Sequence, residues 1–268
     1  MNLNINNEYD RLVKVVLAPV DKEYLKQQKQ LINILNKYDV EIMMSKKCDD
    51  TKYQMFIRDP FIVIGNKILI SHMKDNTRKL EYGSANEILD KIENIKKIYL
   101  SEDIIIEGGD IIVHNDIIFV GQNGNRTNEK GLEFLRKTFS SDYKIIPLIM
   151  INPSKNIPLI HLDCLFNPIS IDTAILYKEG LDEKSLNQIK SLFTNIIYVD
   201  NEEQNELATN VLSLGNKVII VQKRHDKLIR NLKDNGFKVE TMDIYDTVKD
   251  TGYSRCLTCP LERIGDCC

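Results

Sequence analysis

Short runs of β-branched and other apolar residues recur along this chain at intervals of about 45 to 55 residues. The runs cover residues 13–17, 67–70, 117–120, 174–177 and 217–221. Several of them follow an Asn or Asp, as expected where a turn enters a strand. A repeat of this length is typical of proteins built from similar modules, so it constrains the fold more than any single motif does.

A helix and a second strand are predicted after each run. Amphipathic patterns indicate helices at residues 25–35, 80–95, 131–139, 181–193 and 226–235. Second strands are predicted at residues 40–42, 97–100, 143–146, 196–199 and 238–240. The chain is therefore predicted to be an α/β protein of five strand–helix–strand units. The periodicity fits a radially closed propeller, which leaves few bare sheet edges, and equally an ordinary doubly wound sheet.

The overall composition excludes several classes of function. Lys and Arg number 36 against 39 Asp and Glu, a net charge of −3, so no nucleic-acid binding is expected. We expect neither a membrane span nor a secretion signal, because no apolar run approaches the required roughly 18 residues and the N-terminus lacks a basic region before an apolar one. The six cysteines are then expected to be reduced thiols in the cytoplasm. No Pro-, Gly- or Ser-rich linker interrupts residues 1–268, so we expect one domain.

Two acidic turns are candidate parts of a binding site. Asp59 precedes Pro60, which fixes the backbone and keeps Asp59 out of helical geometry, so its carboxylate can point into a cavity. Glu107-Gly108-Gly109-Asp110 lies between two apolar runs, and paired glycines in a strand pattern indicate a bulge or a close backbone approach. A solvated turn at Asp59 and a plain hairpin at Glu107 are the alternatives.

A histidine and a cysteine supply candidate reactive groups. His161 and Asp163 share one face at strand spacing, so the carboxylate can set the charge that acid–base chemistry needs. The alternative for His161 is a buried core histidine. Cys256 in Arg255-Cys256-Leu257-Thr258 is a candidate nucleophile.

The cysteines near the C-terminus allow a second interpretation. Cys256 and Cys259 form a CxxC pair, and Cys267 and Cys268 follow, so a zinc site is an alternative. Two adjacent terminal cysteines are poor tetrahedral ligands, and Pro260 disfavours a redox CxxC at the start of a helix. No metal is expected.

Two arginines are candidates for binding a carboxylate. Arg78 and Arg126 lie in polar turns, and a planar guanidinium binds a carboxylate through two parallel hydrogen bonds. An exposed surface arginine is the alternative in both cases.

Together the motifs resemble the guanidino-group-modifying enzymes, the superfamily of arginine deiminases, dimethylargininases and amidinotransferases. The resemblance covers four ordered blocks at residues 56–61, 107–110, 161–163 and 255–260. It implies the pentein fold, a five-unit α/β propeller, and so favours the propeller over the doubly wound sheet. It also implies that residues 1–268 form a single catalytic pentein domain.

The resemblance also implies a role for each matching residue. Cys256 would be the nucleophile, His161 the acid and base, and Glu107 a carboxylate that supports the histidine. Asp59 and Asp163 would bind the guanidinium. The remaining implied positions are the α-carboxylate ligands Arg78 and Arg126 and a pocket wall, Phe61.

The implied activity is hydrolysis of a guanidinium C–N bond, arginine to citrulline and ammonia, through a covalent amidino-thioether. An amidinotransferase and a dimethylargininase-type hydrolase are the alternatives, since the chain is shorter than an arginine deiminase and its Gly252-Tyr253-Ser254 lead is poor in glycine. A non-catalytic pentein or zinc-binding module is the alternative of another class. No cofactor is expected, and the expected partner is a small guanidino substrate. Assembly into a homo-oligomer stays open.

Overall fold

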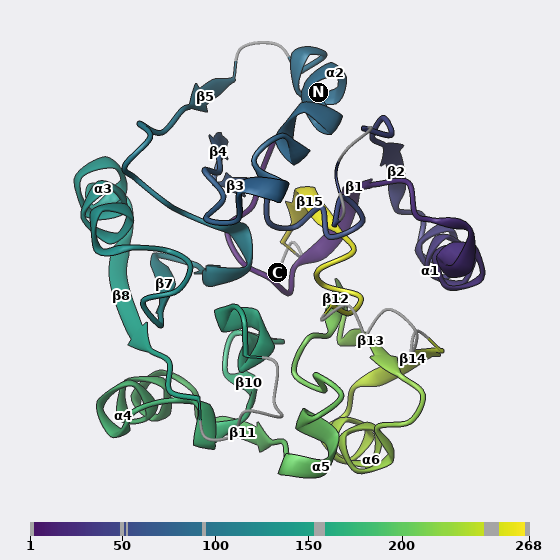
Figure 1. The fold of residues 1–268 in the computed structure, drawn as a ribbon. Coiled ribbons are helices and arrows are strands. Elements are labelled where there is room, and N and C mark those ends of the chain that lie inside the picture. Colours follow the sequence, from purple (N-terminus) through teal and green to yellow (C-terminus); the bar gives the residue numbers. More distant parts are fainter. Residues whose placement is uncertain are drawn as a thin grey trace.

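Five three-stranded sheets form a ring in the computed structural model, with the helices on its outer side (Figure 1). The structure describes residues 3–48, 51, 53–92, 95–152, 159–243 and 252–265. This arrangement is the predicted five-unit propeller, and the doubly wound alternative is wrong.

The three strands of each sheet have the same relative directions. The strands of the sheets are, in spatial order, β15 (Cys259–Ile264), β1 (Arg11–Leu17) and β2 (Glu41–Met44); β3 (Phe61–Ile64), β4 (Lys67–Ile70) and β5 (Lys96–Ile98); β6 (Ile111–His114), β7 (Ile117–Gln122) and β8 (Lys144–Ile149); β9 (Phe166–Pro168), β10 (Thr173–Leu176) and β11 (Asn195–Tyr198); and β12 (Leu212–Gly215), β13 (Val218–Gln222) and β14 (Lys238–Met242). The middle strand is antiparallel to the first and parallel to the third. The middle and third strands are the two that the sequence predicts in every unit.

Helices connect the parallel strands, because a parallel pair requires a crossover. The connecting helices are α1 (Leu25–Lys37), α2 (Asn86–Asp90), α3 (Glu129–Phe139), α4 (Glu183–Leu192) and α6 (Asp226–Asp234), while the short α5 (Asn201–Gln204) leads from β11 to β12 of the next sheet. The helix predicted at residues 80–95 is instead a 3₁₀ turn, η3 (Glu81–Ala85), followed by the short α2. Gly83 lies inside this segment, and glycine weakens a helix interior by about 1 kcal/mol.

The last strand closes the ring. β15 pairs antiparallel with β1, from Arg11 opposite Ile264 to Val16 opposite Cys259. The closing strand brings the segment that precedes it, with Cys256, against units formed much earlier in the chain.

The apolar cores lie between neighbouring units, and charged groups occupy the centre. For example, Leu132, Leu135 and Phe139 of α3 pack in one core with residues of β6 and β7 and of the preceding sheet, β3 to β5. Around the centre several ionisable side chains are buried, namely Glu8, Arg58, Asp59, Asp163, Arg255 and Arg263. Buried charges need partners, so the centre is where specific polar geometry is expected.

Among the described helices none is long and apolar enough to cross a membrane.

Candidate active site

The segment just before the first strand of each unit supplies the polar residues of the centre. Asp59 precedes β3, Glu107 precedes β6, and Cys256 precedes β15. His161 and Asp163 precede β9, at the 3₁₀ turn η5 (Leu162–Cys164). The ring therefore brings together residues that lie far apart in the sequence.

A cavity of about 250 Å³ opens at this meeting point. Its lining residues are Tyr53, Phe56, Asp59, Asp75, Arg78, Arg126, Ile160, His161 and Cys256. The predicted nucleophile, the predicted acid and one predicted guanidinium ligand thus share one cavity. Glu107 and Asp163 lie behind this lining, in contact with His161 and Cys256 respectively.

His161 is held between two carboxylates. Its Nε2 lies 2.6 Å from Oε2 of Glu107, and its Nδ1 lies 3.6 Å from Oδ1 of Asp59. Burial disfavours the charged imidazole, but the two carboxylates and Asp110 outweigh burial and raise the pKa of His161 to about 10. The imidazole is therefore protonated at neutral pH and is ready to act as an acid.

Gly108 and Gly109 let the backbone of the second acidic turn lie directly against the Arg58 carbonyl and the His161 ring. A Cβ on Gly109 would lie 2.7 Å from the His161 ring, and one on Gly108 would lie 2.0 Å from the carbonyl oxygen of Arg58. The Gly109 N–H donates to Oδ1 of Asp59 at 3.0 Å, which fixes that carboxylate beside His161. The predicted close backbone approach is confirmed.

Asp59 also pairs with Arg78, a contact that the sequence did not predict. Nη1 of Arg78 donates to Oδ2 of Asp59 at 2.8 Å, and its Nε and Nη2 donate to Glu81 at 2.8 to 3.1 Å. Burial raises the pKa of Asp59, but His161 and Arg78 outweigh burial, so the pKa lies below its ordinary value. Asp59 is therefore ionised, and Arg78 is anchored by two carboxylates.

Glu107 holds the other side of His161. Its Oε1 accepts the Lys74 N–H at 2.8 Å, and Nη1 of Arg126 lies 3.7 Å from its Oε2. Burial raises the pKa of Glu107, but the hydrogen bond from His161 and the positive charges of His161 and Arg126 together outweigh burial and lower the pKa overall. The Arg126 side chain is 23% exposed, against 7% for Arg78, so Arg126 is the more accessible cation on this wall.

Cys256 is buried and neutral in this structure. Its thiol lies 3.8 Å from Oδ2 of Asp163, and Nδ2 of Asn210 lies 3.1 Å from the sulfur. Burial, and then the negative charge of Asp163, raise the pKa of Cys256 well above its ordinary value. Formation of the thiolate therefore requires added positive charge or hydrogen-bond donors near the sulfur.

A buried ion-pair chain supports Asp163 from behind. Nε of Arg255 lies 3.3 Å from Oδ2 of Asp163, and Nη1 and Nη2 of Arg255 donate to Glu8 at 2.6 and 3.1 Å. Burial raises the pKa of Glu8, but Arg255 and Arg58 outweigh burial and lower the pKa to about 2. No local sequence signal marked Glu8, because its partners Arg58 and Arg255 are far away in the sequence.

Phe61 and Cys259 lie in an apolar core and do not line the cavity. Phe61, the expected pocket wall, is the fully buried first residue of β3, and Phe56 and Tyr53 line the cavity instead. The Cys259 sulfur points into the same core, 3.4 Å from the carbonyl oxygen of Phe61. Within the described ranges no group of three or more His, Cys, Asp or Glu side chains is placed to hold a metal, while Cys267 and Cys268 lie outside them.

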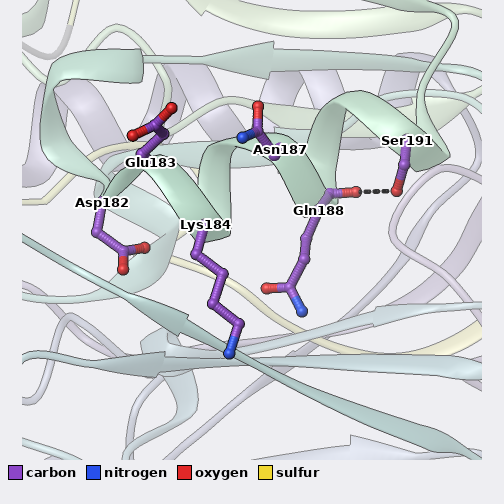
Figure 2. A pocket seen from close by; sticks show the side chains of 6 residues that line it. All are labelled: Asp182, Glu183, Lys184, Asn187, Gln188 and Ser191. Atoms are coloured by element: carbon purple, nitrogen blue, oxygen red, sulfur yellow. Dashed lines mark hydrogen bonds between the residues drawn. The ribbon is translucent and has the colours of Figure 1, made fainter.

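A larger hollow of about 730 Å³ lies elsewhere on the surface, along α4 (Figure 2). All of its lining side chains belong to that helix or to its N-cap, from Asp182 to Ser191, and they are polar. None of the predicted site residues lies there, so size alone does not identify the active site.

Solved structures of two enzymes share this fold. The amidinotransferase SxtG from Microseira wollei superposes with a TM-score of 0.88 over 98% of both chains at 20% identity. The N-terminal domain of ArgZ, a cyanobacterial arginine dihydrolase, superposes with a TM-score of 0.84 over 95% of this chain and 98% of that one at 19% identity. The fold is thus the pentein fold, and its central cavity holds a thiol and an imidazole.

Sequence comparison gives the family. The model of the eukaryotic N,N dimethylarginine dimethylhydrolases matches residues 2–263, and the chain belongs to that family of cysteine-dependent guanidino-modifying enzymes. An uncharacterized Bacillus subtilis protein, YkgA, is 31% identical over 88% of this chain and 79% of its own length. Arginine deiminase from Borrelia garinii is 23% identical over 98% of this chain and 71% of its own length.

Proposed function

We propose that this protein hydrolyses a guanidinium C–N bond in arginine or a close relative, with citrulline and ammonia as the products from arginine. The observation that carries the proposal is that one cavity is lined by the Cys256 thiol, the protonated His161 and the ionised Asp59. Two further carboxylates, Glu107 and Asp163, lie directly behind them. This set of groups suits a cationic, planar substrate attacked by sulfur.

Substrate binding would be coupled to formation of the thiolate. Asp59 and Asp163 would bind the guanidinium N–H groups and present the carbon to Cys256. Because His161 already has its proton, the thiol proton would leave to solvent as the substrate cation arrives. The cation offsets the Asp163 charge that raises the pKa of Cys256.

The reaction would then proceed in two halves. The thiolate attacks the guanidinium carbon, and His161 donates its proton to the departing nitrogen, so ammonia leaves and an amidino-thioether remains. His161, now neutral, accepts a proton from water, and the hydroxide adds to the carbon of the amidino-thioether. The adduct loses its hydroxyl proton to solvent, where ammonia takes it up as ammonium. The C–S bond then breaks, which releases the ureido product and restores the thiolate and the protonated imidazole.

The two cavity arginines would recognise the α-carboxylate of a free amino acid. Arg126 is the more available of the two, since Nε, Nη1 and Nη2 of Arg78 already donate to Glu81 and Asp59. Asp75 also lines the cavity and offers a carboxylate for an α-ammonium group. A free amino acid rather than a bare guanidine is therefore the proposed substrate class.

Dimethylarginine hydrolysis is the second candidate, and the family match over residues 2–263 favours it. One assay separates the candidates: the purified protein is incubated with arginine, N,N-dimethylarginine and agmatine in turn, and ammonia, dimethylamine and ureido product are measured. Citrulline with ammonia supports the first candidate, and citrulline with dimethylamine supports the second. Transfer of the amidino group to an added amine, without ureido product, would indicate an amidinotransferase instead.

A further inference from the structure

The fifth unit also supplies a residue to the centre, at the position where the other units supply theirs. Asn210 lies two residues before β12, just as Asp59 lies two residues before β3. Every other unit places a predicted site residue in this segment. Asn210 is 1% exposed, and no motif in the sequence singled it out.

Both ends of the Asn210 amide contact Cys256. Oδ1 accepts the Cys256 N–H at 3.3 Å, and Nδ2 lies 3.1 Å from the Cys256 sulfur. Nδ2 also lies 3.3 Å from the carbonyl oxygen of Asp163. The orientation of the amide follows from these partners, since the backbone N–H needs an acceptor and the carbonyl needs a donor.

A backbone hydrogen bond with Tyr253 favours a negative charge on the sulfur, but burial and the neighbouring carboxylates oppose that charge more strongly. Asp163 faces the sulfur at 3.8 Å, and the Asp163 carboxylate repels a thiolate. A neutral N–H donor stabilises a thiolate without competing with a substrate cation for the carboxylates. From this geometry we infer that Asn210 is a catalytic residue that donates a hydrogen bond from Nδ2 to the ionised sulfur of Cys256. The inference rests on the proposed role of Cys256 as the nucleophile.

The test is the pH dependence of alkylation, which needs no guanidino substrate. Wild type, Asn210→Ser and Asn210→Asp are treated with iodoacetamide across a pH series, and alkylation of the Cys256 peptide is followed by mass spectrometry. Serine is too short to keep the contact with sulfur, and aspartate replaces the donor by a charge. Below the pKa of the thiol we expect alkylation to slow by about tenfold or more in Asn210→Ser and further in Asn210→Asp.

Asn167 is the matched control. It is also buried, and its Nδ2 donates to the carbonyl oxygens of Thr209 and Val211, so it supports the same segment without touching the sulfur. Asn167→Ser should leave the alkylation midpoint unchanged. An unshifted midpoint in folded Asn210→Ser, or an equal shift in Asn167→Ser, would overturn the inference.

A measurement on the wild type covers the case in which the Asn210 variants do not fold. The Asn210 side-chain amide resonance should move with the same pH midpoint as the alkylation of Cys256, and a resonance that stays constant through that midpoint overturns the inference. Failure of the proposed function is distinguishable, because it shows in the substrate assay and not in alkylation: no guanidino compound is turned over, or turnover survives loss of the Cys256 thiol.

Discussion

The two sides of the cavity hold their reactive groups in opposite states. On the imidazole side, Glu107 and Asp59 outweigh burial and raise the pKa of His161 to about 10, so the acid is charged before substrate arrives. On the thiol side, burial and Asp163 raise the pKa of Cys256, so the nucleophile is neutral. The same kind of neighbour, a carboxylate, thus stabilises the charge of one group and opposes that of the other.

This difference indicates how binding of the substrate would activate the site. A bound guanidinium adds positive charge where both sides have carboxylates. That charge favours proton release from Cys256, and it also favours proton donation by His161. The substrate would therefore complete the active state of the enzyme, while the protein alone keeps the sulfur protonated.

The largest effect is expected on the thiol side, from Cys256→Ser. An alkoxide is far harder to form than a thiolate, so turnover of the preferred guanidino substrate should fall by on the order of 10⁶-fold while the fold is kept. Steady-state kinetics and circular dichroism check this. Cys259→Ser is the control, because the Cys259 sulfur points into the core. If activity is lost in Cys259→Ser and kept in Cys256→Ser, the wrong thiol has been assigned.

On the imidazole side, His161→Gln should lower kcat by about 10²- to 10⁴-fold, since it removes the proton donor. The stability difference between wild type and this variant should also depend on pH. The pKa of His161 is raised from 6.5 to about 10, so its stabilisation is complete below pH 6.5 and is lost as pH rises towards 10. Urea denaturation of both proteins at several pH values measures the difference. A difference that stays constant over this range would contradict the charged imidazole.

The support behind the thiol side is tested by Glu8→Gln. The change removes the buried counter-charge that Arg255 and Arg58 share and leaves Arg255 only Asp163, so it should destabilise the fold by about 3–5 kcal/mol. The pKa of Glu8 is lowered from 4.5 to about 2, so its contribution is present above pH 4.5 and is lost as pH falls through about 2.

Glu41→Gln is the matched control for Glu8. Glu41 pairs with Lys14 at 3.0 Å, but its side chain is 58% exposed, so the change should cost less than about 1 kcal/mol. If the two variants lower the free energy of unfolding equally in urea denaturation, the buried ion-pair chain contributes no more to stability than the exposed pair does.

The smallest expected effect separates the two arginines of the cavity. Arg126→Ala should raise KM for arginine by about 10- to 150-fold and change agmatine turnover little, because agmatine lacks the α-carboxylate. Arg78→Ala should impair both substrates, since it strips Asp59 and Glu81 of their counter-charge. The ratio of kcat/KM for arginine and agmatine in each variant is the measurement. An unchanged ratio in Arg126→Ala would remove Arg126 from substrate recognition.

Local patterns predicted much of the fold. The middle and third strands of each unit follow from periodicity within about 50 residues, and so do the helices apart from the one predicted at residues 80–95, which is a 3₁₀ turn and the short α2. The first strands were harder, because β9 has only three residues and β15 pairs with β1 across the whole chain. Ring closure therefore had to come from the resemblance and not from the repeat alone.

The site was predictable where a motif constrains the backbone. Asp59 before a proline, Glu107 before two glycines and His161 near Asp163 all have local signals, and Cys256, Asp59 and His161 do line one cavity. Asn210 and Glu8 have none, because their importance comes from contacts with the distant segment 255–256. Phe61 was misplaced because both faces of β3 are buried in apolar cores, and Phe61 packs in one of them with Val63. A pattern of residue types predicts which groups are present, while their partners depend on the closed ring.

In the proposed mechanism the Cys256 sulfur bonds to the substrate's guanidinium carbon. The most direct test is to quench the protein in acid during turnover of its preferred guanidino substrate and to map the mass of every cysteine-containing peptide. We expect an amidino adduct on the peptide with Cys256, at a steady-state level that disappears when substrate is exhausted. Turnover with that peptide unmodified throughout, or an adduct confined to another cysteine, would contradict this mechanism.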